Sequence, residues 1–506
     1  MNDDFQILPT DEYNEALVDH VHPSDWINPT PAGRYNLVVI GGGPAGLVAA
    51  AGAAGCGARV ALVERQFMGG DCLNFGCVPS KALIHAARRA AGMRGHERSG
   101  ISSTGVQVDF ATAMQRLRRL RSEIGAHDSV RRFTSLGVDV FLGSGHFTGP
   151  NTLNVNETEL SFHSAVIATG ARAAKPPIPG LANVTALTNE TVFSLTELPA
   201  RLAVIGAGPI GCEMAQSFAR LGSQVSLIES SAGILPKEDP EAAAIVQARL
   251  QQDGVSLLSS AQHLQLAPGP GGTIQITLDS MGLTHNLTVD HLLLAAGRAP
   301  NIEGLNLETA GVRYDRTGVL VDDMLRTTNR RIFAAGDICS RYQFTHSADF
   351  MARMVIQNAL FFGRKKMSQL IIPWATYTSP EIAHVGLTAA QAQARGLKIT
   401  TYTQPLSGVD RALLDDETDG MVRVHVRQGT DQIVGATIVA EQAGDMISEI
   451  TLAMTHKIGL GGIAATIHPY PTQADAIRKI GDQYNRTRLT PRLRSLFSTL
   501  MSWRRR

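Results

Sequence analysis

Two apolar runs, each interrupted by a glycine-rich turn, dominate the hydrophobic pattern of the chain. The first is LVVIGGGPAGLVAAAGAAGCGARVALV, residues 37–63, and the second is LAVIGAGPIGCEMA, residues 202–215. In both, a short apolar stretch predicts a buried strand, the glycines predict a tight turn, and the residues that follow predict a helix. The first run is long enough to span a bilayer, but its glycine spacing and the acidic residue that ends it favour strand–turn–helix–strand. The pattern predicts an α/β fold with two dinucleotide-binding domains.

Changes in this pattern predict where the other parts of the chain begin and end. Residues before about Arg34 are polar and carry several prolines, which predicts an extension lying on the surface or on a neighbour. Turns near Gly180 and Gly297 predict domain boundaries. From about Pro373 the sequence changes to alternating strands, which predict a separate C-terminal α+β domain.

One helical segment is unusually rich in arginine. Residues 110–136 have a helical pattern and contain Arg116, Arg118, Arg119 and Arg121. Charges spaced along a helix most often lie on its solvated side. We therefore expect these arginines to be exposed to solvent.

The two glycine turns have the spacing of dinucleotide fingerprints. The first glycine permits a tight turn, the second admits a pyrophosphate close to the backbone, and the third lets the helix approach the strand. The helix N-terminus then offers free amides to the phosphates. The residues concerned are Gly41, Gly43, Gly46 and Glu64 in the first fingerprint, and Gly206, Gly208, Gly211 and Glu229 in the second.

Each fingerprint is followed by a strand that ends in a glutamate, at the distance expected of a ribose-binding carboxylate. At Glu229 such a carboxylate would accept hydrogen bonds from a ribose 2′-hydroxyl and repel a 2′-phosphate, and Ser230 and Ser231 follow it instead of arginine. The second site is therefore predicted to favour NADH over NADPH. The alternative is a solvated Glu229 at a strand end and an enzyme that uses both cofactors.

Composition narrows the class of protein. A chain of 506 residues with 44% hydrophobic residues is large enough for three or four packed domains. The net charge of +1 gives no electrostatic case for a nucleic-acid partner. The acidic N-terminus lacks the basic start and apolar centre of a signal peptide, so we expect a cytoplasmic protein.

The cysteines point to redox chemistry. The chain has five of them, and Cys72 and Cys77 lie close together in GGDCLNFGCVPSK. A loop this short restricts the unfolded chain little, so a disulfide there is better read as redox-active than as structural. Pro79 suits the first turn of a helix, which would place Cys77 at a helix N-terminus and lower its thiol pKa. The alternative is two buried, inert cysteines.

The string GGDCLNFGCVPSK resembles the redox motif of the flavin-dependent disulfide oxidoreductases, a family that includes dihydrolipoyl dehydrogenase, glutathione reductase and mercuric reductase. The resemblance covers residues 35–484, with both fingerprints, an ATG string at 168–170 and an AAGD string at 334–337. It implies two Rossmann-like domains and a C-terminal α+β dimerisation domain. It also implies FAD in the first site, NAD(P)H in the second, and a homodimer.

The domain boundaries follow from the pattern and the resemblance together. They are 1–34 for the N-terminal extension, 35–180 and 298–372 for the two parts of the FAD-binding domain, 181–297 for the NAD(P)-binding domain, 373–484 for the dimerisation domain and 485–506 for a basic amphipathic tail.

The resemblance also assigns roles by motif. It implies that Cys77 is the thiol next to the flavin, that Cys72 exchanges with the substrate, and that Lys81 lies near the reactive ring nitrogen. Glu213 would be the ion-pair partner of Lys81 beside the nicotinamide, and Asp337 would bind the ribityl chain. Further cofactor-binding residues in the matching segments are Thr169, Gly170, Gly297 and Gly336.

The C-terminal motif departs from most disulfide reductases, which carry His-Pro-Thr-x-x-Glu with the histidine as acid–base group for the partner subunit's thiols. Here the segment reads IHPYPTQAD. Aligning the proline and the acid places Tyr470 in the histidine's position, with Asp475 as the acid. Aligning the first His-Pro instead keeps His468 but places it two residues too far from Asp475. We prefer the first alignment, because the geometry depends on the spacing between histidine and acid.

A tyrosine at this position is similar to mercuric reductase, and soft thiolates suit a soft metal ion. Those enzymes also resemble one another in an adjacent C-terminal cysteine pair, whereas this sequence has no cysteine after Cys339. We therefore expect electrons to pass from NAD(P)H through flavin to the Cys72–Cys77 disulfide and on to a metal ion or another thiol-reactive acceptor. The alternatives are a dihydrolipoyl-dehydrogenase-like reductase of small-molecule disulfides and a non-catalytic, membrane-associated flavin-binding module.

The tail LTPRLRSLFSTLMSWRRR is a separate feature. Leu493, Leu496, Phe497 and Leu500 share one helical face, and arginines flank them. Such a helix can lie on an anionic membrane surface, here the inner face. The alternatives are a helix that packs on the dimer and a frayed end.

Overall fold

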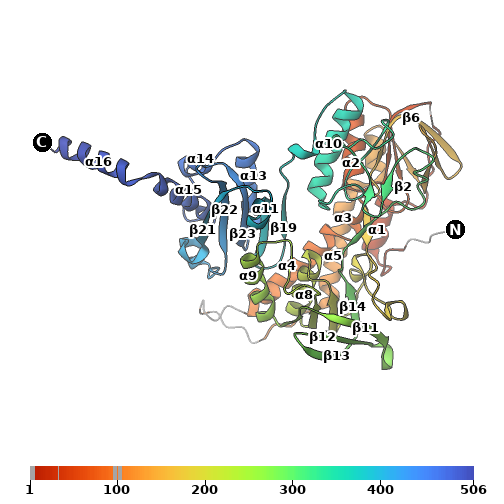
Figure 1. The fold of residues 1–506 in the computed structure, drawn as a ribbon. Helices are drawn as coiled ribbons and strands as arrows, with labels where there is room; N and C mark the ends of the chain where they lie inside the picture. Colours follow the sequence, from red (N-terminus) through yellow and green to blue (C-terminus); the bar gives the residue numbers. More distant parts are fainter. Residues whose placement is uncertain (1–5, 32, 95–99, 101–104, 506) are drawn as a thin grey trace. The chain divides into compact units, whose positions relative to one another are not determined.

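The computed structural model describes residues 6–31, 33–94, 100 and 105–505, so that residues 1–5 and 32 of the extension and Arg506 of the tail lie outside it. The described chain forms two compact units (Figure 1). One comprises residues 1–230 and 254–370, and the other comprises residues 231–253 and 371–506. The prediction of two Rossmann-like domains with a C-terminal α+β domain is confirmed, although the individual boundaries stay a prediction.

The first unit contains one sheet for each fingerprint. The first sheet has the order β3-β2-β1-β6-β5-β4, with β18 also pairing with β6, and β1, β2, β3, β6 and β18 run parallel. Its strands are β1 (Tyr35–Ile40), β2 (Val60–Glu64), β3 (Val138–Leu142), β4 (Gly145–Gly149), β5 (Thr152–Val155), β6 (Thr158–Ile167) and β18 (Ile332–Ala334). Such parallel strands are buried on both faces and read as continuous apolar runs.

The second sheet is entirely parallel and has the order β10-β9-β8-β14. Smaller antiparallel sheets join β11-β12-β13, β7-β15 and β16-β17. The bounds are β7 (Ala171–Ala173), β8 (Arg201–Ile205), β9 (Gln224–Ile228), β10 (Val255–Leu258), β11 (Gln262–Pro268), β12 (Ile274–Ser280), β13 (Leu283–Val289), β14 (His291–Leu294), β15 (Arg298–Pro300), β16 (Tyr314–Asp315) and β17 (Gly318–Val319).

Helices link and cover these strands. They are α1 (Glu12–Val21), α2 (Pro44–Gly55), α3 (Gly70–Asn74), α4 (Cys77–Arg94), α5 (Phe110–Gly125), α6 (Val130–Ser135), α7 (Asn189–Val192), α8 (Pro209–Leu221) and α10 (Thr345–Leu360). α2 and α8 each follow a fingerprint and begin with proline at the first helical position, where the missing amide hydrogen costs little. Each therefore starts directly at its glycine turn.

The N-terminal extension differs from its prediction. It forms α1, whose Leu17 and Val21 are fully buried in the same core cluster as strands β1 and β2. Asp11 caps the helix by accepting from the amide of Asn14 at 2.9 Å. The described part of the extension is thus packed into the first unit, because its apolar residues at helical spacing find a buried partner surface.

The expectation of a solvated arginine face on α5 is wrong for two of the four residues. Arg119 is exposed, but Arg118 and Arg121 are buried, at 6% and 1% exposure. Arg118 pairs with Asp11, and Arg121 binds the side chain of Asn14 at 2.6 Å. The sequence pattern of α5 gave no sign of this, since both partners come from α1 and the residue before it.

The second unit is an antiparallel sheet with the order β19-β20-β23-β22-β21. Its elements are β19 (Pro373–Thr376), β20 (Glu381–Gly386), β21 (Ile399–Pro405), β22 (Met421–Arg427), β23 (Ile433–Ala440), α9 (Pro240–Gln252), α11 (Ala389–Ala394), α12 (Asp410–Leu414), α13 (Ala443–Thr455), α14 (Leu460–Ala465), α15 (Asp475–Arg488) and α16 (Pro491–Arg504). Helices α13, α14 and α15 contribute buried side chains to its core, together with the sheet.

The tail forms the expected helix. α16 follows α15 and extends away from the sheet of its unit (Figure 1), and none of its described residues is buried. Within the described residues, no helix combines the length and the apolar character needed to cross a bilayer.

Candidate redox site and nucleotide cradles

The first fingerprint has the backbone that its spacing predicts. At Gly41, with φ +106°, a Cβ would lie 2.3 Å from the carbonyl oxygen of Ala168, and at Gly46 it would lie 1.8 Å from that of Gly41. At Gly43 the nearest atom to such a Cβ is 3.8 Å away. The first and third glycines are therefore required by packing, whereas the second leaves room beside the N-terminus of α2, as close approach of a pyrophosphate needs.

Glu64, at the end of β2, lies against this turn. Its carboxylate is buried and accepts from the amides of Gly42 and Gln66, both at 2.6 Å. Burial raises its pKa, and these two amides oppose that shift. The carboxylate is thus held at the edge of the turn, where a ribose hydroxyl would reach it.

The second fingerprint repeats this arrangement. A Cβ would lie 2.6 Å from the carbonyl oxygen of Ala295 at Gly206, and 1.8 Å from that of Gly206 at Gly211. At Gly208 no atom lies within 4 Å of such a Cβ. Glu229 accepts from the amide of Ala207 at 2.7 Å, as Glu64 does from Gly42. Both cradles therefore fit a dinucleotide, FAD in the first and a nicotinamide cofactor in the second.

The two motif cysteines lie on consecutive short elements. Cys72 is in α3 and half-buried, while Cys77 is exposed and is the first residue of α4. Both are free thiols in this structure. The Cys77 sulfur lies 3.5 Å from the hydroxyl oxygen of Thr345, at the start of α10.

The surroundings of the two thiols shift their pKa values in opposite directions. The pKa of Cys77 is lowered to about 6, chiefly by a hydrogen bond from Cys72, with further lowering by Thr345 and by the charge of Lys81. Burial opposes this shift. The same hydrogen bond raises the pKa of Cys72, and burial adds to the effect. Near neutral pH, Cys77 is therefore the thiolate of the pair and Cys72 the thiol.

Lys81 and Glu213 form the ion pair that the motifs predict. The Lys81 ammonium donates to Glu213 Oε2 at 2.8 Å, across α4 and α8. The Glu213 side chain is 5% exposed and that of Lys81 is 36% exposed. One turn beyond Cys77, this pair therefore joins the cysteine helix to the helix of the second fingerprint.

A second set of polar contacts was not predicted. Asp71, next to Cys72, accepts from Asn189 at 2.6 Å and pairs with Arg298 at 3.0 Å. Arg298 also lies 3.6 Å from Asp337, and burial raises the pKa of Asp337 to about 6 against the opposing charge of Arg298. Asp71 and Arg298 stand inside or beside recognised motifs, but their pairing joins distant parts of the chain and leaves no sequence pattern.

The remaining predicted residues lie on turns of the first unit. Thr169 and Gly170 are held by Asn301, which donates its side-chain amide to Thr169 O at 2.8 Å and its backbone amide to Gly170 O at 3.0 Å. Gly336 and Gly297 both have positive φ, at +85° and +113°. These positions suit close approach of a ligand to the backbone.

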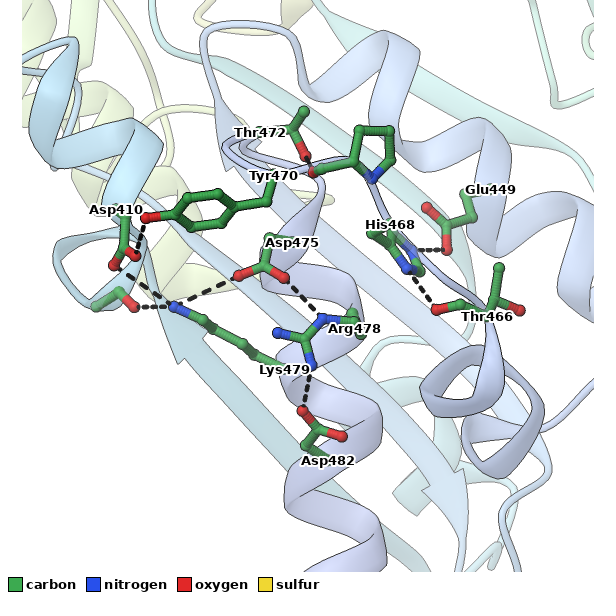
Figure 2. A network of polar contacts seen from close by, with 12 residues as sticks. Asp410, Glu449, Thr466, His468, Tyr470, Thr472, Asp475, Arg478, Lys479 and Asp482 are labelled. Atoms are coloured by element: carbon green, nitrogen blue, oxygen red, sulfur yellow. Dashed lines mark hydrogen bonds and ion pairs between the residues drawn. The ribbon is translucent and has the colours of Figure 1, made fainter.

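In the second unit, Tyr470 and Asp475 are not bonded to each other (Figure 2). The Tyr470 hydroxyl donates to Asp410 at 3.0 Å, and this hydrogen bond raises the pKa of the phenol. Asp475 pairs with Arg478 at 2.8 Å and with Lys479 at 3.5 Å, and Lys479 lies 4.0 Å from Asp410. The two predicted residues therefore belong to one network that Asp410 and Lys479 complete, and neither of these was predicted.

His468 has a different partner. Its Nε2 lies 2.8 Å from Glu449 Oε1, and its Nδ1 lies 3.0 Å from the carbonyl oxygen of Thr466 (Figure 2). The side chain is 6% exposed, whereas Tyr470 is 73% exposed. Glu449, on α13, was missed because nothing near His468 in the sequence points to it. Which of the two residues is the acid–base group stays a prediction.

Comparisons with known proteins agree with this geometry. Residues 35–352 match the model of the pyridine nucleotide-disulphide oxidoreductases, and residues 372–480 match that of their dimerisation domain. A mercuric reductase of Staphylococcus aureus is 35% identical over 447 residues, which cover 88% of this chain and 82% of that protein. A dihydrolipoyl dehydrogenase of Geobacillus stearothermophilus is 32% identical over 441 residues, which cover 86% of this chain and 93% of that one.

Among solved structures, the Cu(II) complex of the HOCl-induced flavoprotein disulfide reductase RclA from Escherichia coli has a TM-score of 0.78 at 28% identity. The match covers 89% of this chain and 100% of the other. The fingerprints, the cysteine pair and these relatives lead to one conclusion: the chain belongs to the pyridine nucleotide-disulphide oxidoreductases, a family of FAD-containing, NAD(P)H-dependent enzymes with a dimerisation domain.

Proposed function

We propose that this enzyme uses electrons from NADH to reduce a thiol-reactive acceptor, with a soft metal ion as the preferred class, at Cys72 and Cys77. The observation that carries the proposal is the pair formed by Cys72 of α3 and Cys77 at the start of α4, with the pKa of Cys77 lowered to about 6 chiefly by the hydrogen bond from Cys72. A thiolate is both a nucleophile and a ligand for soft metals, so this pair can serve either acceptor class.

Bound FAD supplies the chemistry that accepts a hydride from the nicotinamide and passes an electron pair to sulfur. The chain supplies orientation and charge. The turn formed by Gly41, Gly43 and Gly46 would receive the pyrophosphate beside Gly43. Lys81 places its cation beside Cys77, and Glu213 fixes that cation from α8. Cys72, the thiol, would then meet the acceptor.

Tyr470 supports a metal acceptor. Its raised pKa, caused first by Asp410, keeps the phenol protonated at neutral pH, where it is a hydrogen-bond donor and a poor base. Ordinary disulfide exchange needs a base for the attacking thiol. A soft metal ion that binds Cys72 instead displaces the thiol proton, which can pass to water. Mercuric reductases among the relatives, and a Cu(II) complex among the structural matches, agree with this class of acceptor.

The main alternative is a reductase of small-molecule disulfides, as in dihydrolipoyl dehydrogenase. The pair of His468 and Glu449, 2.8 Å apart, favours it, because a histidine oriented by a carboxylate is a competent acid–base group. In either case we propose a homodimer, in which this segment serves the partner subunit's thiols. A non-catalytic flavin-binding module is the third possibility.

An acceptor comparison tests the proposal. With NADH as donor, we expect kcat/KM for mercuric or cupric ion to exceed that for lipoamide or glutathione disulfide by at least ~10-fold. Tyr470→Phe should lower metal reduction by about 10-fold, whereas His468→Ala should leave it within about 3-fold. NADH oxidation measured by absorbance gives these values.

The opposite pattern would contradict the metal proposal. Suppose that the enzyme turns over lipoamide rapidly, that His468→Ala abolishes this activity and that Tyr470→Phe leaves it intact. That result would assign the enzyme to the reductases of small-molecule disulfides. The FAD content and melting temperature of both variants should match those of the unchanged enzyme. If both variants lose the same activity with FAD content and stability intact, neither residue alone determines the acceptor, which also contradicts the metal proposal.

For the tail, we propose peripheral contact of α16 with anionic lipid. The chain has no Asp or Glu after Asp482, while Arg486, Arg488, Arg492, Arg494, Arg504, Arg505 and Arg506 follow it. On α16, Leu496, Leu500 and Trp503 share one face and are 62%, 43% and 71% exposed. An exposed apolar face bordered by arginines matches the chemistry of an anionic membrane surface.

Vesicle binding tests this contact with two variants of equal charge. Leu500→Glu places a carboxylate on the apolar face and Ser498→Glu places one on the opposite face. We expect the full chain to sediment with phosphatidylglycerol-containing vesicles, Leu500→Glu to weaken binding by at least ~10-fold, and Ser498→Glu to weaken it by about 5-fold or less. Absence of binding at low salt, with a change of oligomer mass in Leu500→Glu, would instead assign the helix to the dimer.

A further inference from the structure

The N-terminal segment is linked through Arg121 of α5 to the helix that carries Cys72, although it lies before residue 35, where the match to the oxidoreductase family begins. We propose that this segment is a positioning element of the redox site: a buried chain of contacts from Asn14 through Arg121 to Asn74 holds α3 and thereby fixes the two thiols. This inference rests on the proposed redox function of Cys72 and Cys77.

Arg121 is the centre of this chain. Its side chain lies on α5 and is 1% exposed. One guanidinium nitrogen donates to the carbonyl oxygen of Asn74 at 2.7 Å, and another donates to Asn14 Oδ1 at 2.6 Å. Asn14 is itself 1% exposed. A single buried cation thus connects α1 with the last residue of α3.

Asn74 connects Arg121 to both ends of α3 through its hydrogen bonds. Its side-chain amide donates to the carbonyl oxygens of Met68 at 3.0 Å and Gly70 at 2.8 Å, just before and at the start of the helix. Asn74 is fully buried. With its own carbonyl held by Arg121, this residue fixes both ends of the helix in which Cys72 lies.

Because Arg121 is a buried cation, it requires hydrogen-bond acceptors in place of water. Burial, and then the neighbouring charge of Arg118, lower its pKa to about 10, so it is still a cation at neutral pH. Both of its bonds to the redox helix and to α1 go to uncharged oxygens. Removing one acceptor from a buried cation leaves it undersolvated, so the surrounding helices must shift to restore hydration.

Apolar and backbone contacts accompany the hydrogen bonds from Asn14 through Arg121 to Asn74. A Cβ at Gly125 of α5 would lie 2.6 Å from Leu17 of α1 and 4.0 Å from Leu73 of α3, so both residues pack at one point. The amide of Met68 donates to the carbonyl oxygen of Val21 at 3.1 Å. The segment therefore contacts the residues just before the redox helix directly, and it is linked to the helix itself through α5.

The thiols are sensitive to such a shift. The Cys77 sulfur lies 3.5 Å from the hydroxyl oxygen of Thr345, and the low pKa of Cys77 depends first on the hydrogen bond from Cys72. A displacement of α3 moves Cys72 away from this position, and the effect of a hydrogen bond on a pKa falls steeply with distance.

Two asparagine variants separate positioning from simple stability. Asn14→Ala removes the hydrogen bond to Arg121 and so interrupts the series of contacts that leads to α3. Asn28→Ala removes the other asparagine that ties the segment down, which bonds the backbone of Leu142 in β3 at 2.9 and 2.8 Å. Both should lower the melting temperature, since each removes partly buried hydrogen bonds. Only the first acts on α3.

Thiol alkylation reports on the redox site without any acceptor. In the two-electron-reduced holoenzyme, iodoacetamide modification of each cysteine is followed by mass spectrometry from pH 5 to 9. For Asn14→Ala we expect the ionisation midpoint of Cys77 to rise by about 0.5 pH unit or more, and Cys72 alkylation at pH 7 to change by about 5-fold or more. Asn28→Ala should stay within about 2-fold. Asn14→Asp keeps the acceptor for Arg121 but loses the donor to the carbonyl oxygen of Pro9, so its profile should lie nearer to that of the unchanged enzyme than to that of Asn14→Ala.

An alkylation profile of Asn14→Ala that matches those of the unchanged enzyme and of Asn28→Ala would overturn the proposal and leave the segment a purely stabilising role. A shift of equal size in both asparagine variants would overturn it as well. Because no electron acceptor is present, failure of the enzyme to reduce metal ions would not alter these readings.

Discussion

Replacing Cys72 by serine is expected to lower acceptor reduction by at least ~10³-fold while FAD stays bound, because a serine hydroxyl neither ionises near neutral pH nor forms a disulfide. The matched control is Cys56→Ser, which changes an exposed free thiol at the end of α2. NADH-dependent reduction of the metal ion and of lipoamide measures the effect, and flavin absorbance of the purified protein measures cofactor retention.

The same variant should also change the ionisation of Cys77. Its pKa is lowered to about 6 first by the hydrogen bond from Cys72, so the thiolate of the unchanged enzyme forms as the pH rises through about 6. Without that bond, burial dominates and the midpoint should move upward by about one pH unit or more. Thiolate absorbance, corrected with the double cysteine variant, gives the midpoint.

Undiminished acceptor reduction in Cys72→Ser would exclude the dithiol route. Absence of acceptor reduction by the unchanged, FAD-loaded enzyme would instead support a non-catalytic module. A variant that loses FAD would show that Cys72 is needed for folding of the cradle. In that case Cys72→Ala, which is apolar and of similar volume, offers the second measurement.

The turns of both fingerprints and the helix that begins at Cys77 can be predicted from the sequence because they depend on local geometry. A tight turn needs glycine at the first and third positions, and the structure shows carbonyl oxygens where a Cβ would stand at Gly41, Gly46, Gly206 and Gly211. The start of α4 at Cys77 likewise follows from a proline two residues later. Such features depend on a few adjacent residues and can therefore be predicted from the sequence.

The parts that the sequence did not reveal depend on contacts between distant segments. Arg118 and Arg121 look like solvated charges on α5 until Asp11 and Asn14 are brought against them. In the same way, Tyr470 was expected to act with Asp475, but its hydroxyl bonds Asp410. A spacing argument ranks neighbours along the chain, whereas a hydrogen bond depends on proximity in space.

The second large effect concerns the nicotinamide cofactor. We expect kcat/KM for NADH to exceed that for NADPH by about 100-fold, because a carboxylate at Glu229 would bind a ribose 2′-hydroxyl and repel a 2′-phosphate. Its anchor is the amide of Ala207 at 2.7 Å, and the side chain belongs to a buried residue, so the charge is held in place. Glu229→Gln removes the charge but keeps an acceptor for that amide, and should reduce the preference by about 10-fold.

The first fingerprint provides the matched control for this experiment. Glu64 accepts from the amide of Gly42 at 2.6 Å in the equivalent geometry, so Glu64→Gln makes the same chemical change in the other cradle. It should weaken FAD retention and leave the ratio of NADH to NADPH efficiency unchanged if, as we propose, the two carboxylates serve different cofactors. A clear preference for NADPH in the unchanged enzyme, or a ratio that Glu64→Gln alters as much as Glu229→Gln does, would contradict the assignment of Glu229 to the nicotinamide ribose.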